Sequence, residues 1–497
     1  METSEKLSIH FSDYFDVSVK ALENAGAFNI SLISDIPLFI DPFLLFNSDK
    51  PKYQELHSQI IKYLRFLQKR AGFVRENRAY LRLWYTFPEV KETWLGFSKT
   101  GNQGSGLGLD FARSLSRNLN SIFSNFGQEK ITRGSHLEKV CLIGEGVGKD
   151  NISDFTTNLI KEHLIEFTQL FAEEHISEDR LKEFSVNRVR FNYQTESWES
   201  GKYFLPHFDG DFVLLTPKDV LTREEIWINK SDLIKDFESI TIALPNPQLR
   251  AQVNNYFRKM LPYDPTSKEK RDAASATIFE FPQVIEYYIR RKEDSGDRAI
   301  AISEERVDIT KKVFVDIARE LANELFNKTG FYEISGNTLS EAKERVQYLK
   351  DFIEYKKGYR LFYSDGQLIS TEADLQLLFR LTWFGTPSDI SQEVDDGRGP
   401  ADFKISRGAL DKTIVEFKLA SNTKLKQNLQ TQAELYQKAS DAQHTLKVIF
   451  FFSEKERDRV NGILEELNLR DHPDIILIDA RDDNKPSASV AKSVDLD

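Results

Sequence analysis

The chain has 497 residues, 40% of them apolar, which is enough for sizeable hydrophobic cores and favours about two to four domains. Its formal net charge of −11 argues against a protein that coats nucleic acid through overall basicity. A single cysteine excludes an intrachain disulfide, and the histidines show no zinc-type spacing. The sequence has neither a signal-peptide core nor a long apolar run. We therefore expect a cytoplasmic protein without a membrane span.

The first part of the chain, residues 1–262, is expected to form a mixed α+β region. Apolar residues at helical spacing predict a helix over 53–69, whereas the aromatic stretch 79–87 and the apolar run 140–144 favour extended strands. An Asp-Gly pair at 209–210 between two apolar segments predicts a hairpin.

A glycine-rich segment at 100–108 precedes a predicted helix over 110–126, and glycine-rich turns at helix N-termini can bind phosphate. The segment matches neither the Walker pattern nor the dinucleotide fingerprint, because no lysine followed by serine or threonine ends it. A plain flexible loop is therefore the simpler interpretation. A site for a phosphorylated ligand stays open as an alternative.

Residues 263–360 are expected to form a helical connector, because apolar residues recur at helical spacing, most regularly over 307–326. A capping-box pattern then begins a helix at 371, with Glu372 in the first turn, where an acidic residue favours the helix dipole. A short strand with Glu393 in its middle is expected to follow.

The segment 413–419 reads as a strand, since β-branched and aromatic residues dominate it. Side chains alternate between the two faces of a strand, so this segment has one apolar face, which includes Val415 and Phe417. We expect that face to pack under the helix that follows. The opposite face carries Glu416 and Lys418 side by side.

A short glycine-containing turn connects this strand to the segment before it, so the two are expected to form a hairpin. In that pairing Asp402 and Glu416 lie on the same face of neighbouring strands, where two carboxylates repel unless a cation lies between them or one is protonated. Mg²⁺ suits such a site because it prefers oxygen ligands and is often held by one or two carboxylates. With Lys418 placed to act on an attacking water, the predicted reaction class is metal-assisted phosphodiester hydrolysis.

Asp402, fourteen residues before Glu416-Phe417-Lys418, resembles the PD-(D/E)XK nuclease superfamily, which includes restriction-type and RecB-type nucleases. Pro400 lies two residues before Asp402 rather than next to it, a slight departure from the pattern. The resemblance implies a restriction-endonuclease-like αβββαβ core in a nuclease domain at 361–480, with the aspartate and the Glu-X-Lys motif on the hairpin. It also implies Mg²⁺ (or Mn²⁺) as cofactor, DNA rather than RNA as substrate, endonuclease activity, and a homodimer or higher homo-oligomer, since such sites often work in pairs.

The motif and the resemblance together nominate the site residues. The catalytic candidates are Asp402, Glu416 and Lys418, followed by Glu372 and Gln432. The expected metal ligands are Asp402, Glu416, the carbonyl of Phe417 and Glu372, with Glu393 as the rival third carboxylate. The expected nucleic-acid contacts are Arg398, Lys404, Lys424, Lys426 and Tyr436. Gln432 and Tyr436 are similar to residues that line the substrate groove in the RecB-type variant.

The remaining C-terminal segments are expected to alternate between helix and strand. A strand over 446–452, reached by a helical crossover, a helix over 454–467 and a strand over 475–479 complete the domain, and a polar tail at 481–497 is expected to be disordered. Residues 397–451 contain nine Lys or Arg and five Asp or Glu, a balance of +4. A phosphate-binding face would need such a basic segment, although local charge balances of this size are also common by chance.

The expected architecture is therefore α/β and α+β, with a sensing, targeting or oligomerising N-terminal region that controls a C-terminal nuclease. By analogy at the level of the fold, this combination suggests bacterial defence against phage or foreign DNA. Two alternatives stay open: an inactive nuclease fold that only binds nucleic acid, and a nucleotide-regulated sensor built on the glycine-rich loop.

Overall fold

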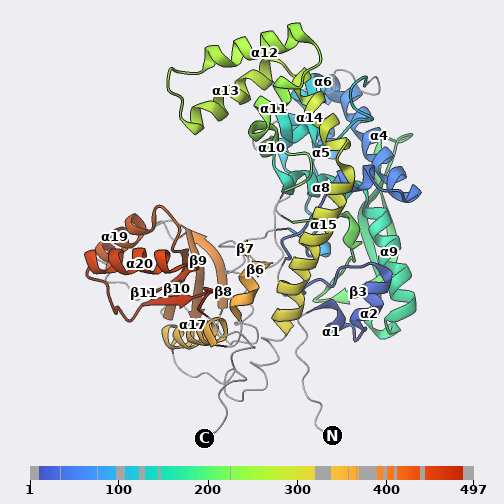
Figure 1. Cartoon of the computed structure of the whole chain (residues 1–497). Helices are drawn as coiled ribbons and strands as arrows, with labels where there is room; N and C mark the ends of the chain where they lie inside the picture. Colours follow the sequence, from blue (N-terminus) through green and yellow to red (C-terminus); the bar gives the residue numbers. More distant parts are fainter. Residues whose placement is uncertain are drawn as a thin grey trace, which may run out of the picture. The chain divides into compact units, whose positions relative to one another are not determined.

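The computed structural model has a mixed α/β fold, as expected from the sequence (Figure 1). It describes residues 10–33, 35–74, 77–96, 107–122, 129–143, 147–223, 225–319, 337–355, 358–364, 367–368, 389–395, 400–407, 411–436 and 443–484. The chain divides into two compact units, one from Ser8 to Lys311 and one that contains Lys312 to Asp497. No helix in the described part of the chain is long and apolar enough to cross a membrane.

The unit from Ser8 to Lys311 is mainly helical and holds short strands and one long hairpin. Its first half contains α1 (Phe11–Tyr14), α2 (Val19–Ala25), β1 (Phe39–Ile40), α3 (Pro42–Phe46), α4 (Pro51–Val74), α5 (Arg78–Tyr85), η1 (Lys91–Thr93), α6 (Leu109–Ile122), α7 (Lys139–Ile143), α8 (Lys149–Leu159) and α9 (Lys161–His175). Its second half contains η2 (Glu178–Arg180), β2 (Leu181–Asn192), β3 (Ser197–Phe208), β4 (Asp211–Phe212), η3 (Lys218–Val220), β5 (Leu221–Thr222), α10 (Lys230–Lys235), α11 (Phe237–Ile242), α12 (Pro247–Met260), α13 (Ser267–Glu280), α14 (Gln283–Glu293) and α15 (Gly296–Lys311).

Several sequence expectations for this unit are confirmed. The helix expected over 53–69 is α4, which buries its apolar residues at helical spacing. The Asp-Gly pair at 209–210 joins β3 to β4, and Gly210 adopts a positive φ of 82° that glycine accommodates without strain. The glycine-rich segment 100–108 lies outside the described residues apart from Leu107 and Gly108.

Two expectations of extended structure were wrong. The aromatic stretch 79–87 is mostly helix α5, because Leu81, Trp84 and Tyr85 form one buried face at helical spacing. Residues 140–143 of the apolar run belong to the short helix α7, and Gly144 lies outside the described residues. So short an apolar run does not by itself distinguish helix from strand. Tertiary burial decided both cases.

The unit that contains Lys312 to Asp497 is built around a five-stranded mixed sheet. Its elements are η4 (Lys312–Ile317, a π-helical turn), α17 (Thr338–Tyr355), η5 (Gly358–Phe362), β6 (Tyr363–Ser364), β7 (Gln367–Leu368), β8 (Asp389–Asp395), β9 (Pro400–Arg407), β10 (Asp411–Leu419), α19 (Leu425–Tyr436), β11 (Gln443–Phe451), α20 (Glu454–Glu466) and β12 (Ile475–Asp479). The strand order is β12-β11-β10-β9-β8. Strands β8, β9 and β10 form an antiparallel meander, and β10, β11 and β12 run parallel.

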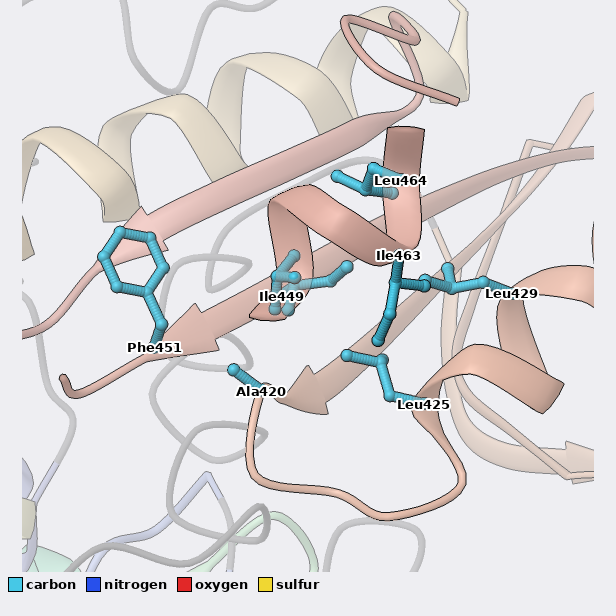
Figure 2. Close-up of a cluster of buried hydrophobic side chains, with 8 residues drawn as sticks. Ala420, Leu425, Leu429, Ile449, Phe451, Ile463 and Leu464 are labelled. Carbon is cyan, nitrogen blue, oxygen red and sulfur yellow. The ribbon is translucent and has the colours of Figure 1, made fainter. Parts of the chain in front are cut away.

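The parallel half of the sheet follows from its connections. A chain that enters parallel strands needs a crossover, and α19 and α20 supply the two crossovers. Both helices cover one face, where a buried cluster unites the sheet with the helices (Figure 2). The cluster comprises Ala420, Leu425, Leu429, Ile449, Phe451, Val460, Ile463 and Leu464.

The opposite face of the sheet packs against α17. Thr413 shares this face with Val415 and Phe417, and its hydroxyl lies 2.8 Å from the hydroxyl of Thr338 at the start of α17. The expectation that the Val415 face packs under the following helix was therefore wrong. Because β11 brings Ile449 into register with Lys418, the following helix α19 covers the Glu416 face instead.

The observed units differ from the expected domain limits. The boundary after Lys311 lies inside the segment 263–360 that was expected to be a connector, so α13 to α15 belong to the N-terminal unit and α17 to the C-terminal unit. Disorder was expected from residue 481 onward, but Arg481 is buried and its guanidinium pairs with Asp479 at 2.7 Å. The rest of that tail, 485–497, lies outside the described residues.

Candidate active site

The hairpin expected around Asp402 and Glu416 is present as β9 and β10. Phe403 pairs with Val415 in the antiparallel register, so the next positions along the two strands are 402 and 416. Strand β10 is fully described at these positions, whereas for Asp402 the structure describes the backbone alone. The backbone register therefore brings both motif carboxylate positions to neighbouring strands on one face, as expected from the sequence.

The register extends this arrangement to a third acidic position on β8. Gln392 pairs with Phe403 and Val394 pairs with Ala401, which places position 393 opposite position 402. The backbone thus sets Glu393, Asp402 and Glu416 in one row across β8, β9 and β10, with side chains described for Glu416 alone. The rival third ligand Glu393 therefore has a defined place in the row, while Glu372 lies outside the described residues.

The row continues onto β11 with a residue to which the sequence had assigned no role. Glu416 pairs in register with Lys447, and the Lys447 ammonium lies 3.0 Å from Glu416 Oε2. The Lys447 side chain is 1% exposed and that of Glu416 is 13% exposed. A single charge inside the otherwise apolar run 446–452 was the signal that could have found it, because a fully buried lysine requires a partner.

The remaining parts of the Glu-X-Lys motif occupy the two faces of β10. Lys418 is half-buried on the Glu416 face, in register with Ile449. Phe417 is fully buried on the other face, where its ring contacts the rings of Phe403 and Phe450 at centroid distances of 5.8 and 6.0 Å. The aromatic side chain of Phe417 therefore anchors the strand, and only its backbone carbonyl remains a candidate ligand.

The expected nucleic-acid contacts are placed only in part. Lys424 and Lys426 are exposed at the start of α19, where the Lys424 amide donates to Asn422 Oδ1 at 2.9 Å and Lys426 pairs with Glu466. Gln432 and Tyr436 lie on α19 and Lys404 on β9, in each case with only the backbone described, and Arg398 lies outside the described residues.

The donor set of the row fits a hard divalent ion, since three carboxylate positions lie on adjacent strands and Mg²⁺ prefers such oxygen ligands. The side chains that the structure describes contain no group of three His, Cys, Asp or Glu able to hold a metal ion. Of the three acidic row positions, Glu416 alone has a described side chain.

Comparison with known proteins assigns a domain to a large part of each unit. Residues 16–229 match the family model of a domain of unknown function (DUF8370), and residues 338–454 match that of a second domain of unknown function (DUF8371). The second match runs from the start of α17 into α20 and so contains the whole row. No curated protein matches the chain. No solved structure matches it either.

Proposed function

We propose that the C-terminal unit is a metal-dependent nuclease that hydrolyses phosphodiester bonds, with DNA as its substrate. The observation that carries this proposal is the row of Glu393, Asp402 and Glu416 on adjacent strands, with Lys418 two residues further along β10. Adjacent carboxylates repel each other, so such a row is favourable when a cation neutralises it.

The topology of the sheet supports a restriction-endonuclease-like core. The order β8, β9, β10, α19, β11 has the same sequence of elements as the βββαβ part of the αβββαβ core that the motif implies, with the motif positions on the β9–β10 hairpin. The helix expected before this meander, at 371–383, lies outside the described residues.

Each residue of the site has a distinct role in the proposed mechanism. Asp402 and Glu416 would hold Mg²⁺, with Glu393 or Glu372 and the Phe417 carbonyl as further ligands, and the bound ion would supply Lewis-acid activation of water and phosphate. Lys418 orients the attacking water or receives its proton. Lys424 and Lys426, exposed at the start of α19, hold the substrate through its phosphates without reading its sequence.

The N-terminal unit, in this proposal, decides when or where the nuclease acts, in a cytoplasmic defence against phage or foreign DNA. A homodimer or higher homo-oligomer would allow two sites to cut both strands. The competing reading is a nucleic-acid-binding module without activity, and the Lys447 ammonium on Glu416 is the observation that favours it, because that carboxylate already has a cation.

Cleavage of plasmid and single-stranded DNA with Mg²⁺ or Mn²⁺ tests the proposal. Native protein should cut, whereas Asp402→Ala and Lys418→Ala should lose cleavage by about 100-fold or more while still binding DNA. Lys455→Ala, an exposed lysine on α20, is the matched control and should cut normally. DNA binding with no cleavage by the native protein under either metal would support the binding module instead.

A further inference from the structure

Lys447 lies in the interior of the sheet, where its neighbours along β11 are buried and apolar. Leu446 and Val448 on either side are fully buried, and the Lys447 side chain is 1% exposed. Moving an ammonium group out of water is costly unless a carboxylate compensates for the lost hydration. Glu416 provides that compensation at 3.0 Å, from the directly adjacent position on β10.

A buried ion pair is weak evidence for a purely stabilising role. Replacing such a pair by well-packed apolar residues is often neutral or favourable for stability. If position 447 served packing alone, an aliphatic residue would therefore serve at least as well, as the buried Ile449 does two residues further along the same face of β11. Position 447 instead carries a lysine, at the end of the row that contains Asp402 and Glu416 and directly beside Glu416.

We propose that Lys447 is a positioning residue of the active site: its buried ammonium group fixes Glu416 in place and opposes the divalent ion that binds the same carboxylate. This inference rests on the proposed function. The ammonium and the ion carry the same sign of charge and attract the same oxygen atoms, so each weakens the binding of the other. Lys447 thereby lowers the metal affinity of the site. It also compensates the charge of Glu416 in the absence of metal, so the unit can fold before an ion binds.

The test is metal-linked thermal unfolding of the full chain. Lys447→Met keeps an unbranched side chain, one heavy atom shorter than that of lysine, and removes its charge. In EDTA, the C-terminal unit of this variant should melt at a lower temperature than native protein, because the buried Lys447–Glu416 ion pair is lost. Mn²⁺ should restore the variant and raise its melting temperature by more than it raises that of native protein, since the opposing charge is absent.

Lys139→Met is the matched control from the other unit. Lys139 is likewise 1% exposed and pairs with Glu286 at 2.6 Å, far from the row in sequence. Its loss should destabilise the N-terminal unit, and Mn²⁺ should not restore it. Equal responses of Lys447→Met and Lys139→Met to Mn²⁺ would overturn the inference, because Lys447 would then be an ordinary structural partner.

Direct Mn²⁺ titration, followed by the EPR signal of the free ion, provides a second measurement on protein kept folded at low temperature. We expect Lys447→Met to bind Mn²⁺ about tenfold more tightly than native protein. Unchanged or weaker binding would overturn the inference even if native protein cleaves DNA. Tighter binding together with no cleavage by native protein would leave the inference standing and remove the proposed nuclease activity, so the two failures are distinguishable.

Discussion

In the C-terminal sheet, strand register aligns four charged positions that the sequence places far apart or on separate strands. Three acidic positions and one buried lysine occupy consecutive strands at one level of the sheet. Spacing along the chain was enough to predict that positions 402 and 416 lie side by side, because a hairpin joins their two strands. Position 393 gained its place in the row only through the pairing of β8 with β9.

The register predicts which residue is the third ligand of the proposed metal site. Glu393→Gln should reduce Mg²⁺-dependent cleavage by about tenfold or more and raise the Mg²⁺ concentration needed for half-maximal rate, because one charged oxygen ligand is lost. Gln392→Glu, one position away on the opposite face of β8, is the control for a change of charge in this strand. A normal metal requirement in Glu393→Gln combined with loss of activity in Glu372→Gln would assign the third ligand to Glu372.

The lowered pKa of the buried His57 predicts how the stability of the N-terminal unit changes in acid. Burial, together with the nearby His136, lowers the pKa of His57 to about 3. Because this pKa lies below that of a histidine in the unfolded chain, about 6.5, the unfolded chain takes up the proton first and stability falls as the pH drops from about 6.5 towards 3. At pH 5 the loss from this residue should be roughly 2 kcal/mol.

Urea unfolding at pH 7 and pH 5 measures this effect. His57→Phe should flatten the loss of stability between the two pH values, while the same change at His175, a less buried histidine of the same unit, serves as the control. The same acid sensitivity in His57→Phe as in native protein would show that the proton binds elsewhere.

Whole elements are held to the sheet by two different kinds of contact. The helices α19 and α20 pack through the apolar cluster of Figure 2. The helix α17 adds polar contacts at its first turn, where the amide and hydroxyl of Thr338 donate to the Asp411 carboxylate at 2.7–3.1 Å. Asp411 thus satisfies the free amide end of α17 from a neighbouring strand, as a capping residue would.

The packing of α17 predicts unequal effects of two substitutions on β10. Phe417→Ala should lower the free energy of unfolding by about 3–5 kcal/mol, because the side chain is fully buried among Phe403 and Phe450. Ile414→Ala, at a half-buried position on the other face, should cost clearly less. Chemical denaturation of the full chain gives both values, and equal losses would contradict the assignment of the two faces.

At the scale of the molecule, the two units each contain one matched domain, and the boundary after Lys311 is the natural place to divide the chain. A nuclease domain that begins at residue 361 would lack α17 and expose the face that carries Val415 and Phe417. The C-terminal unit therefore has to include α17, because this helix covers an apolar face of the sheet that would otherwise be exposed.

This boundary predicts the behaviour of two fragments. Residues 312–497 should be soluble and retain Mg²⁺-dependent cleavage without the control that the N-terminal unit supplies, whereas residues 361–497 should aggregate. Size-exclusion chromatography and plasmid cleavage provide the readouts. A soluble, folded fragment 361–497 would show that α17 is dispensable, and an inactive but folded fragment 312–497 would contradict the proposed division of labour.

The sequence by itself determined the local elements, which depend on residues close together in the chain. Strand alternation and a short turn were sufficient for the β9–β10 hairpin and for the alignment of positions 402 and 416, and local pattern was sufficient for the helices α4 and α20. Local propensity was not sufficient for α5 and α7, whose aromatic and apolar residues suit either helix or strand until their burial is known.

Only the tertiary structure decided which helix covers which face of the sheet and which charge meets Glu416. Lys447 is thirty-one residues from Glu416 and reaches it through the α19 crossover and the parallel register of β11. Period-two alternation identifies the two faces of a strand, but it contains no information on the partner of either face. That choice depends on contacts between distant segments, which minimise exposed apolar surface and unpaired buried charge for the folded unit as a whole.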